Sequence, residues 1–161
     1  MTVIDVRTDE QALTLTAENR FDAPVERVWQ VWADPRKLEK WWGPPGFPAT
    51  VVDHDLTPGG RITYYMTGPD GAKYHGYMSV LSVEAPHTLQ FEDGFADDTG
   101  APDPSMPTNT TTVRVEADGD GTRMTLVTQY ASAEDMAKLV GMGMVEGITL
   151  ALGQVDALVA A

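Results

Sequence analysis

The sequence predicts an α+β fold in which a curved antiparallel sheet of about seven strands surrounds one long C-terminal helix. Six strand-like segments follow one another over residues 49–130, and all but one of their connections are short, as antiparallel neighbours require. Two short helical patterns come after the first strand. The last segment, 132–159, is the only one long enough to cover the concave face of such a sheet.

The first strand and the two short helices are predicted from the pattern between residues 13 and 40. Apolar and polar residues alternate over 13–21, which is the period of a half-buried strand. Apolar residues then recur at helical spacing after Asp22, which we expect to cap this helix, and Pro24, which suits its first turn. A second short helix is expected to begin at Asp34 and to run through Lys40.

The remaining elements are separated by turn-forming residues. Six further strands are predicted at 49–56, 61–66, 73–83, 88–95, 110–117 and 122–130. The segment 96–109 is rich in Asp, Gly, Pro, Thr and Ser, and we expect a long flexible loop there. Ser132 and Asp135 have the spacing of a capping box at the start of the long helix. With residues 1–12 as an N-terminal extension, the chain 1–161 is predicted to form a single domain.

Composition limits the possible partners. The chain has 24 acidic and 11 basic residues and a formal net charge of −13, which disfavours binding to nucleic acid or to anionic membranes. It has no cysteine, so disulfides, thiolate metal sites and cysteine nucleophiles are excluded. The first residues lack the apolar segment of a signal peptide, and we therefore expect a cytoplasmic protein.

Four short motifs carry a family resemblance. They are RFDAP at 20–24, WWGP at 41–44, PGGR at 58–61 and GMVEG at 143–147. In this order they resemble the START-like, Bet v 1-like (SRPBCC) superfamily, and within it the branch named for activators of the heat-shock protein 90 ATPase. The resemblance implies a helix-grip fold with a cavity between sheet and long helix. Members of the superfamily bind hydrophobic ligands, cyclise polyketides or assist chaperones, so fold alone does not select the function.

The expected ligand site lies between the sheet and the long helix. Its predicted lining combines aromatic and flexible apolar side chains with a helix glycine: Trp41, Trp42, Tyr64, Met66, Tyr77, Met78, Phe91, Met136, Val140, Met144 and Gly147. We expect at least two methionines to line the cavity. Where the family often has Gly-Trp, this chain has Gly143-Met144, which could enlarge or soften the cavity.

Two features of this lining have alternative interpretations. Gly143 and Gly147 either let a neighbouring element pack closely against the helix or leave room for a ligand. Trp41 and Trp42 form either the mouth of the cavity or a plug that closes one end of the fold.

Signals for catalysis and metal binding are few. No serine or threonine lies in a nucleophile elbow, and the candidates for an acid–base group are His75 and Glu146. For Glu146 the alternatives are a solvated helix position or an ion pair with Arg27 or Arg36.

A metal site is not expected at His54, although it has an aspartate on each side, because adjacent strand residues point to opposite faces. Asp55 and Arg61 are expected to pair across the turn between their strands.

These observations predict the binding of a small hydrophobic molecule, without cofactor or metal. The alternatives are a cyclase- or hydrolase-type enzyme acting on a hydrophobic substrate, and a co-factor that activates a chaperone ATPase. We expect binding rather than catalysis, and neither nucleic acid nor membrane as a partner. A homodimer is left open, and a chaperone partner is not favoured.

Overall fold

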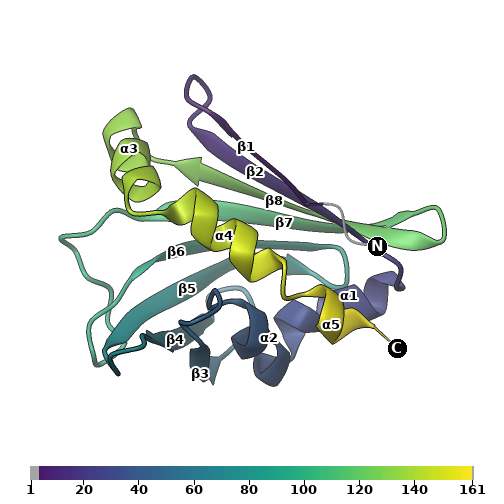
Figure 1. Ribbon diagram of the computed structural model, residues 1–161, viewed down its shortest axis with the longest axis horizontal. Helices are drawn as coiled ribbons and strands as arrows, with labels where there is room; N and C mark the ends of the chain where they lie inside the picture. Colours follow the sequence, from purple (N-terminus) through teal and green to yellow (C-terminus); the bar gives the residue numbers. More distant parts are fainter. Residues whose placement is uncertain (1–3, 161) are drawn as a thin grey trace.

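The computed structural model describes residues 4–160 as one eight-stranded antiparallel sheet with helices against its concave face (Figure 1). The strands lie in the order β1-β2-β8-β7-β6-β5-β4-β3. The elements along the chain are β1 (Ile4–Asp9), β2 (Thr14–Phe21), α1 (Val25–Ala33), α2 (Pro35–Trp41), β3 (Ala49–His54), β4 (Arg61–Thr67), β5 (Lys73–Glu84), β6 (Thr88–Phe95), β7 (Asn109–Asp118), β8 (Gly121–Tyr130), α3 (Ala133–Gly141), α4 (Met144–Leu152) and α5 (Asp156–Val159). The predicted fold class is confirmed.

The sheet has one strand more than the sequence predicts. Ile4–Asp9, expected within an N-terminal extension, forms β1 and pairs antiparallel with β2 from Ile4 opposite Asn19 to Asp9 opposite Thr14. Most of β1 is exposed, because it lies at the edge of the sheet. Only Ile4 and Val6 of β1 are partly buried, and two apolar residues are too few to predict a strand from sequence.

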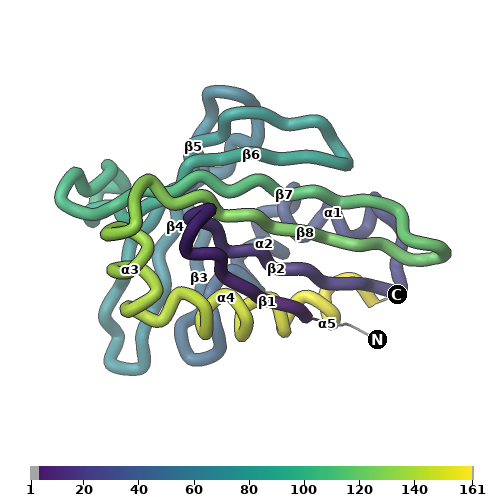
Figure 2. The backbone as a smooth tube through the Cα atoms, turned by 90° about the horizontal axis from the view of Figure 1, so that it is seen from above, coloured from purple at the N-terminus to yellow at the C-terminus, as the bar shows by residue number. Residues whose placement is uncertain are grey.

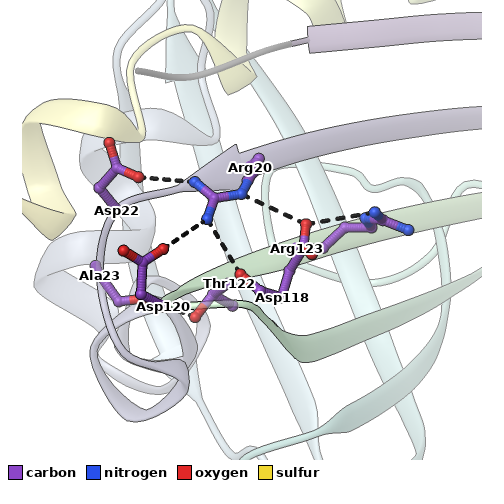
Figure 3. Close-up of polar contacts among 7 residues, drawn as sticks. All are labelled: Arg20, Asp22, Ala23, Asp118, Asp120, Thr122 and Arg123. Carbon is purple, nitrogen blue, oxygen red and sulfur yellow. Dashed lines mark hydrogen bonds and ion pairs between the residues drawn. The ribbon is translucent and has the colours of Figure 1, made fainter.

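The corner between β2 and α1 explains the RFDAP motif. Arg20 pairs with Asp22 at 2.7 Å and with Asp118 at 3.4 Å, and Thr122 donates to the Ala23 carbonyl at 2.6 Å (Figure 3). These contacts tie the end of β2 and the start of α1 to the β7–β8 hairpin. Asp22 does not cap α1 as predicted, because Pro24 is the N-cap residue and contributes no side-chain hydrogen bond.

Side chains cap α2 and α3, whose starts were expected at Asp34 and Ser132. The Asp34 side chain accepts from the backbone N–H of Arg36 at 2.9 Å, at the start of α2. The Ser132 hydroxyl accepts from the N–H of Asp135 at 3.1 Å, at the start of α3. Each cap satisfies a backbone donor that the first turn of a helix leaves without a partner.

The C-terminal segment is not the single long helix predicted for 132–159. Gly143 has φ 92°, a left-handed conformation that cannot continue an α-helix. The chain bends there, so that the helical segments 133–141 and 144–159 differ in direction by 62°. A second break precedes α5. As a result α4 crosses the concave face of the sheet while α3 lies beyond its end (Figure 1).

The interior is densely packed at the end covered by α1, α2 and α5. Trp32 and Trp41 are fully buried, with ring centroids 4.8 Å apart and ring planes at 86°. Trp32 Nε1 donates to Met124 Sδ at 3.3 Å, and Trp41 Nε1 donates to the Val31 carbonyl at 2.9 Å. Figure 2 shows the sheet curving, with β5–β7 on one side of the molecule and α4 and α5 on the other.

The segment between β6 and β7 has local hydrogen bonds. The Asp97 carboxylate accepts from the backbone N–H groups of Thr99 at 2.9 Å and Ala101 at 3.1 Å, and Ala96 forms a β-bridge with Pro102. The flexibility expected for 96–109 stays a prediction.

Within residues 4–160, no single helix is long and apolar enough to cross a bilayer. The segments 133–141 and 144–159 reach the required length and composition only as a pair, across the 62° bend at Gly143.

The bend at Gly143 can be tested by comparison with Gly141. Gly143→Ala should lower the free energy of unfolding by about 1–2 kcal/mol, because it forces an L-residue into the left-handed region. Gly141→Ala, where an added Cβ meets no atom within 4 Å, should leave stability unchanged or raise it by up to about 1 kcal/mol. Urea unfolding followed by circular dichroism measures both. Equal stabilities would contradict the assigned role of Gly143.

Candidate functional site

A cavity lies between α4 and the concave face of the sheet. It has a volume of about 250 Å³, and its walls are mostly apolar. Its lining comes from β2, β4, β6, β7, β8, α4 and the turn after α2, and consists of Leu15, Trp42, Pro44, Tyr64, Met66, Asp93, Thr111, Leu126, Thr128, Met144, Gly147, Ile148 and Ala151. We call this space the α4 chamber.

A second space of about 290 Å³ adjoins the first at the bend between α3 and α4. We call it the bend chamber, because Gly143 lies in its wall together with Leu139 and Met142. The two chambers share Tyr64, Met66, Asp93 and Met144. These four residues therefore lie where a ligand could extend from one chamber into the other.

The glycines of the C-terminal segment leave space. A Cβ added to Gly147 would meet no atom within 4 Å, and one added to Gly143 would meet only a Glu146 carboxylate oxygen at 4.0 Å. Neither position is occupied by a closely packed strand or by the tryptophan turn. Of the two interpretations of these glycines, room beside the helix is the one that agrees with the structure.

The two adjacent tryptophans have different environments. Trp41 is fully buried in the core, where its ring N–H has a partner, so it closes the packed end of the fold. Trp42 lies in the wall of the α4 chamber, and its ring meets those of Tyr64 and Phe91 at centroid distances of 6.2 and 6.3 Å. Trp41 therefore agrees with the plug, whereas Trp42 forms part of the chamber wall.

Tyr64 and Tyr77 face opposite sides of the sheet. Tyr64 points to the concave side over Gly76, where an added Cβ would lie 2.5 Å from the Tyr64 hydroxyl. Tyr77 instead donates to Glu92 at 3.1 Å and lies under the guanidinium of Arg61, on the face away from the chambers. The sequence-based placement of Tyr77 in the cavity wall is therefore corrected, because its neighbour Gly76 occupies the inward position.

Several other predicted lining residues lie elsewhere. Met78 and Phe91 are fully buried in the core and line neither chamber. Met136 and Val140 border a groove against the β1–β2 hairpin, because the bend at Gly143 turns α3 away from the cavity. Met66 and Met144 line both chambers and Met142 lines one of them, so the expectation of at least two methionines is met.

The two acid–base candidates do not project into the α4 chamber. His75 borders the bend chamber, but its ring lies 5.6 Å from that of Tyr65, whose strand position points to the other face. Glu146 is exposed on α4. The proposed ion pairs of Glu146 do not form, since Arg27 donates to the Val159 carbonyl and Arg36 pairs with Glu39.

His54 and its neighbours contact other protein groups and do not form a metal site with any of the described residues. The His54 ring lies 2.9 Å from the Trp32 carbonyl, and no group of three acidic or histidine side chains in residues 4–160 is arranged to hold a metal ion. Within residues 4–160, Asp55 and Arg61 do not form the expected ion pair. Asp55 accepts from the Thr57 hydroxyl at 2.6 Å, and Arg61 stacks on Tyr77 instead.

Asp93 is a functional group that the sequence patterns did not single out. It lines both chambers, and its Oδ1 accepts from the Asn109 side-chain amide at 2.8 Å. Burial raises the pKa of Asp93 to about 7, partly offset by the nearby Thr111 hydroxyl, which favours the anion. A sequence signal was present, because Asp93 follows Leu89 and Phe91 at inward-facing positions of β6.

Two tyrosine hydroxyls near Asp93 stay protonated at neutral pH. Burial, followed by the Asp93 charge, raises the pKa of Tyr64 far above its usual range. The Trp42 ring N–H lies near this hydroxyl but in a geometry too poor for a hydrogen bond, and it has no partner among the described residues. The same two causes raise the pKa of Tyr130 to about 12, and its hydroxyl donates to Met144 Sδ at 3.1 Å.

Comparison with known families identifies the fold. Residues 22–160 match the family described as "Activator of Hsp90 ATPase homolog 1-like protein". The chain belongs to this activator-homologue family. No curated protein matches the chain.

Solved structures of the activator-homologue family and its relatives have the same architecture. The crystal structure of protein Ms6760 from Mycobacterium smegmatis is 51% identical, with a TM-score of 0.90 over 100% of this chain and 98% of that one. The solution structure of an Arthrobacter aurescens protein is 47% identical, with a TM-score of 0.93 over 98% and 92% of the two chains. The AHSA1 protein from Silicibacter pomeroyi is 26% identical, with a TM-score of 0.71 over 89% and 95%.

The buried carboxyl of this activator-homologue protein should make its stability depend on pH. Between about pH 4 and pH 7 the folded state holds a proton on Asp93 that the unfolded state has released, so the Asp93 contribution to stability falls as pH rises. Asp93→Asn should therefore be stabilising relative to the wild type by on the order of 2 kcal/mol at about pH 8, and near neutral at about pH 4. Urea unfolding of both proteins at the two pH values gives this difference. A stability difference between the two proteins that does not change with pH would contradict the raised pKa of Asp93.

Proposed function

We propose that this protein binds a small hydrophobic molecule in the α4 chamber and the bend chamber. The observation that carries the proposal is the open space beside Gly147, bordered by Trp42, Tyr64 and Met144. A space of this size with mostly apolar walls favours apolar ligands, because their binding removes apolar surface from water.

The composition of the walls adds to this support. Met66, Met142 and Met144 are flexible side chains that can adjust to ligands of different shape. The family to which the chain belongs has a ligand-binding domain fold. The proposed ligand therefore occupies the space between sheet and helix rather than the outer surface.

A neutral fluorescent probe and a cavity-filling substitution test the proposal. N-phenylnaphthylamine should bind the wild type with increased fluorescence, and Gly147→Leu should raise its Kd by about tenfold or more, because the new side chain occupies the α4 chamber. The matched control is Gly141→Leu, which adds the same side chain where an added Cβ meets no atom within 4 Å, outside both chambers.

The control variant should bind the probe like the wild type, and circular dichroism should show both variants folded. Failure of the probe to bind the wild type would overturn the proposal. Equal weakening by both leucine variants would place the probe outside the chambers and would also contradict it.

A second candidate function is acid–base catalysis on a hydrophobic substrate, of the cyclase or hydrolase type. The specific observation in its favour is Asp93, a carboxyl in the chamber walls whose pKa of about 7 suits proton transfer near neutral pH. Asp93→Asn would then lower the hydrolysis rate of p-nitrophenyl butyrate by about 100-fold or more. Equal rates in wild type and variant would contradict catalysis of this ester by Asp93.

A further inference from the structure

We propose that the chambers select an apolar ligand that carries a protonated amine, with Asp93 as its counter-ion and the rings of Trp42 and Tyr64 beside it. This inference rests on the proposed ligand-binding function and adds the chemical class of the ligand. It depends on where Asp93 lies, on which charges face it and on the aromatic groups in the same wall.

The position of Asp93 makes it available to a ligand in either chamber. It is the only carboxylate in the lining of both spaces, and no lysine or arginine of the described chain lines either one. Its side-chain partners are neutral groups on the neighbouring strand β7, the amide of Asn109, which donates at 2.8 Å, and the hydroxyl of Thr111. The carboxylate is thus placed in an apolar wall without a cationic partner, and an ammonium ion supplies the missing charge.

The titratable groups around Asp93 do not supply a positive charge. Tyr64 on β4 and Tyr130 on β8 stay neutral, because burial and the Asp93 charge raise both of their pKa values. Glu92 on β6 is negative and is bonded to Tyr77 on the opposite face. The ring of His75 on β5 packs against Tyr65.

The helices α3 and α4 contribute no charged side chain to the walls of either chamber. They present Leu139, Met142 and Met144 to the bend chamber. No counter-ion for Asp93 therefore comes from any element of the described chain that packs around it.

The aromatic rings favour a cation over a neutral ligand of the same shape. Trp42 and Tyr64 both line the α4 chamber with Asp93, and their ring centroids are 6.2 Å apart at an interplanar angle of 82°. The faces of indole and phenol rings attract organic ammonium ions, most strongly where water is excluded. A carboxylate ligand such as a fatty acid would meet the negative charge of Asp93 instead.

A neutral ligand offers the contrasting case. A carbonyl or hydroxyl group would accept a hydrogen bond from protonated Asp93, and its binding would weaken as pH rises. An ammonium ligand needs the ionised carboxylate, so its binding should strengthen over the same range. The direction of the pH dependence therefore separates the two chemistries.

A matched pair of probes tests the inference. Isothermal titration calorimetry is carried out with naphthylmethylamine and naphthylmethanol. The first carries an ammonium group where the second carries a hydroxyl group, and the two are otherwise the same. At about pH 8 the amine should bind the wild type about tenfold more tightly than the alcohol. From about pH 6 to about pH 8 the amine affinity should rise by up to about tenfold, because the carboxylate fraction increases while the amine stays protonated.

Two variants show whether the Asp93 charge itself selects the amine. Asp93→Asn should reduce the ratio of amine to alcohol affinity to about one and remove the pH dependence of amine binding. Glu146→Gln removes one negative charge from the exposed side of α4 and should leave the ratio unchanged, because an exposed charge is screened by solvent.

Equal affinities for the two probes in the wild type would overturn the inference and would leave Asp93 a structural partner of Asn109. Amine binding that weakens from about pH 6 to about pH 8 would overturn it in favour of a neutral ligand. Neither outcome touches the proposed function, which is tested separately by N-phenylnaphthylamine binding to the wild type and to the two leucine variants.

Discussion

The left-handed backbone of Gly143 determines the direction of α4, and the space under that helix depends on it. The glycine ends α3 and turns the chain by 62°, so that α4 crosses the concave face while α3 leaves it. A hydrogen bond from the Tyr130 hydroxyl to Met144 Sδ then holds the start of α4 against β8. Gly147, one turn further along, leaves the helix face bare above the sheet.

The two ends of the interior are consequently different. Beneath α1, α2 and α5 the tryptophans Trp32 and Trp41 fill the space with edge-to-face contacts and have hydrogen-bonded ring nitrogens. Beneath α4 the walls include the flexible side chains of Met66 and Met144 and the bare position of Gly147, and two adjoining chambers remain. The dense packing at one end stabilises the fold without filling the other end, where space for a ligand remains.

The carboxyl of Asp93 gives these chambers their chemical character. Burial of an acid in an apolar wall destabilises its charged form, and here the nearby Thr111 hydroxyl offsets part of that effect. The same desolvation strengthens any interaction with a ligand cation. A group that reduces stability in the empty protein can therefore determine which ligand binds.

Much of the fold was readable from local sequence. Alternation at 13–21, the helix starts at Asp34 and Ser132 and the turn residues between strands predicted the elements in the correct order. The edge strand β1 was missed because most of its side chains are exposed and it shows little alternation. The break at Gly143 was missed because helical spacing of apolar residues continues on both sides of it.

The candidate site was predicted in part. Trp42, Tyr64, Met66, Met144 and Gly147 do line the α4 chamber, since aromatic, methionine and glycine positions are typical of such walls. Tyr77 was placed on the wrong face and Asp93 was not singled out, because the inward face of a strand is fixed by its register against neighbouring strands.

The fold class and the kinds of side chain available to a ligand follow from local sequence, because hydrophobic period, capping and composition act over short stretches of chain. Three-dimensional packing was needed to show that Asp93 and Gly147 line one cavity while Met136 and Tyr77 lie outside it. That arrangement depends on strand register and on one glycine dihedral angle, which bring together residues far apart in the chain.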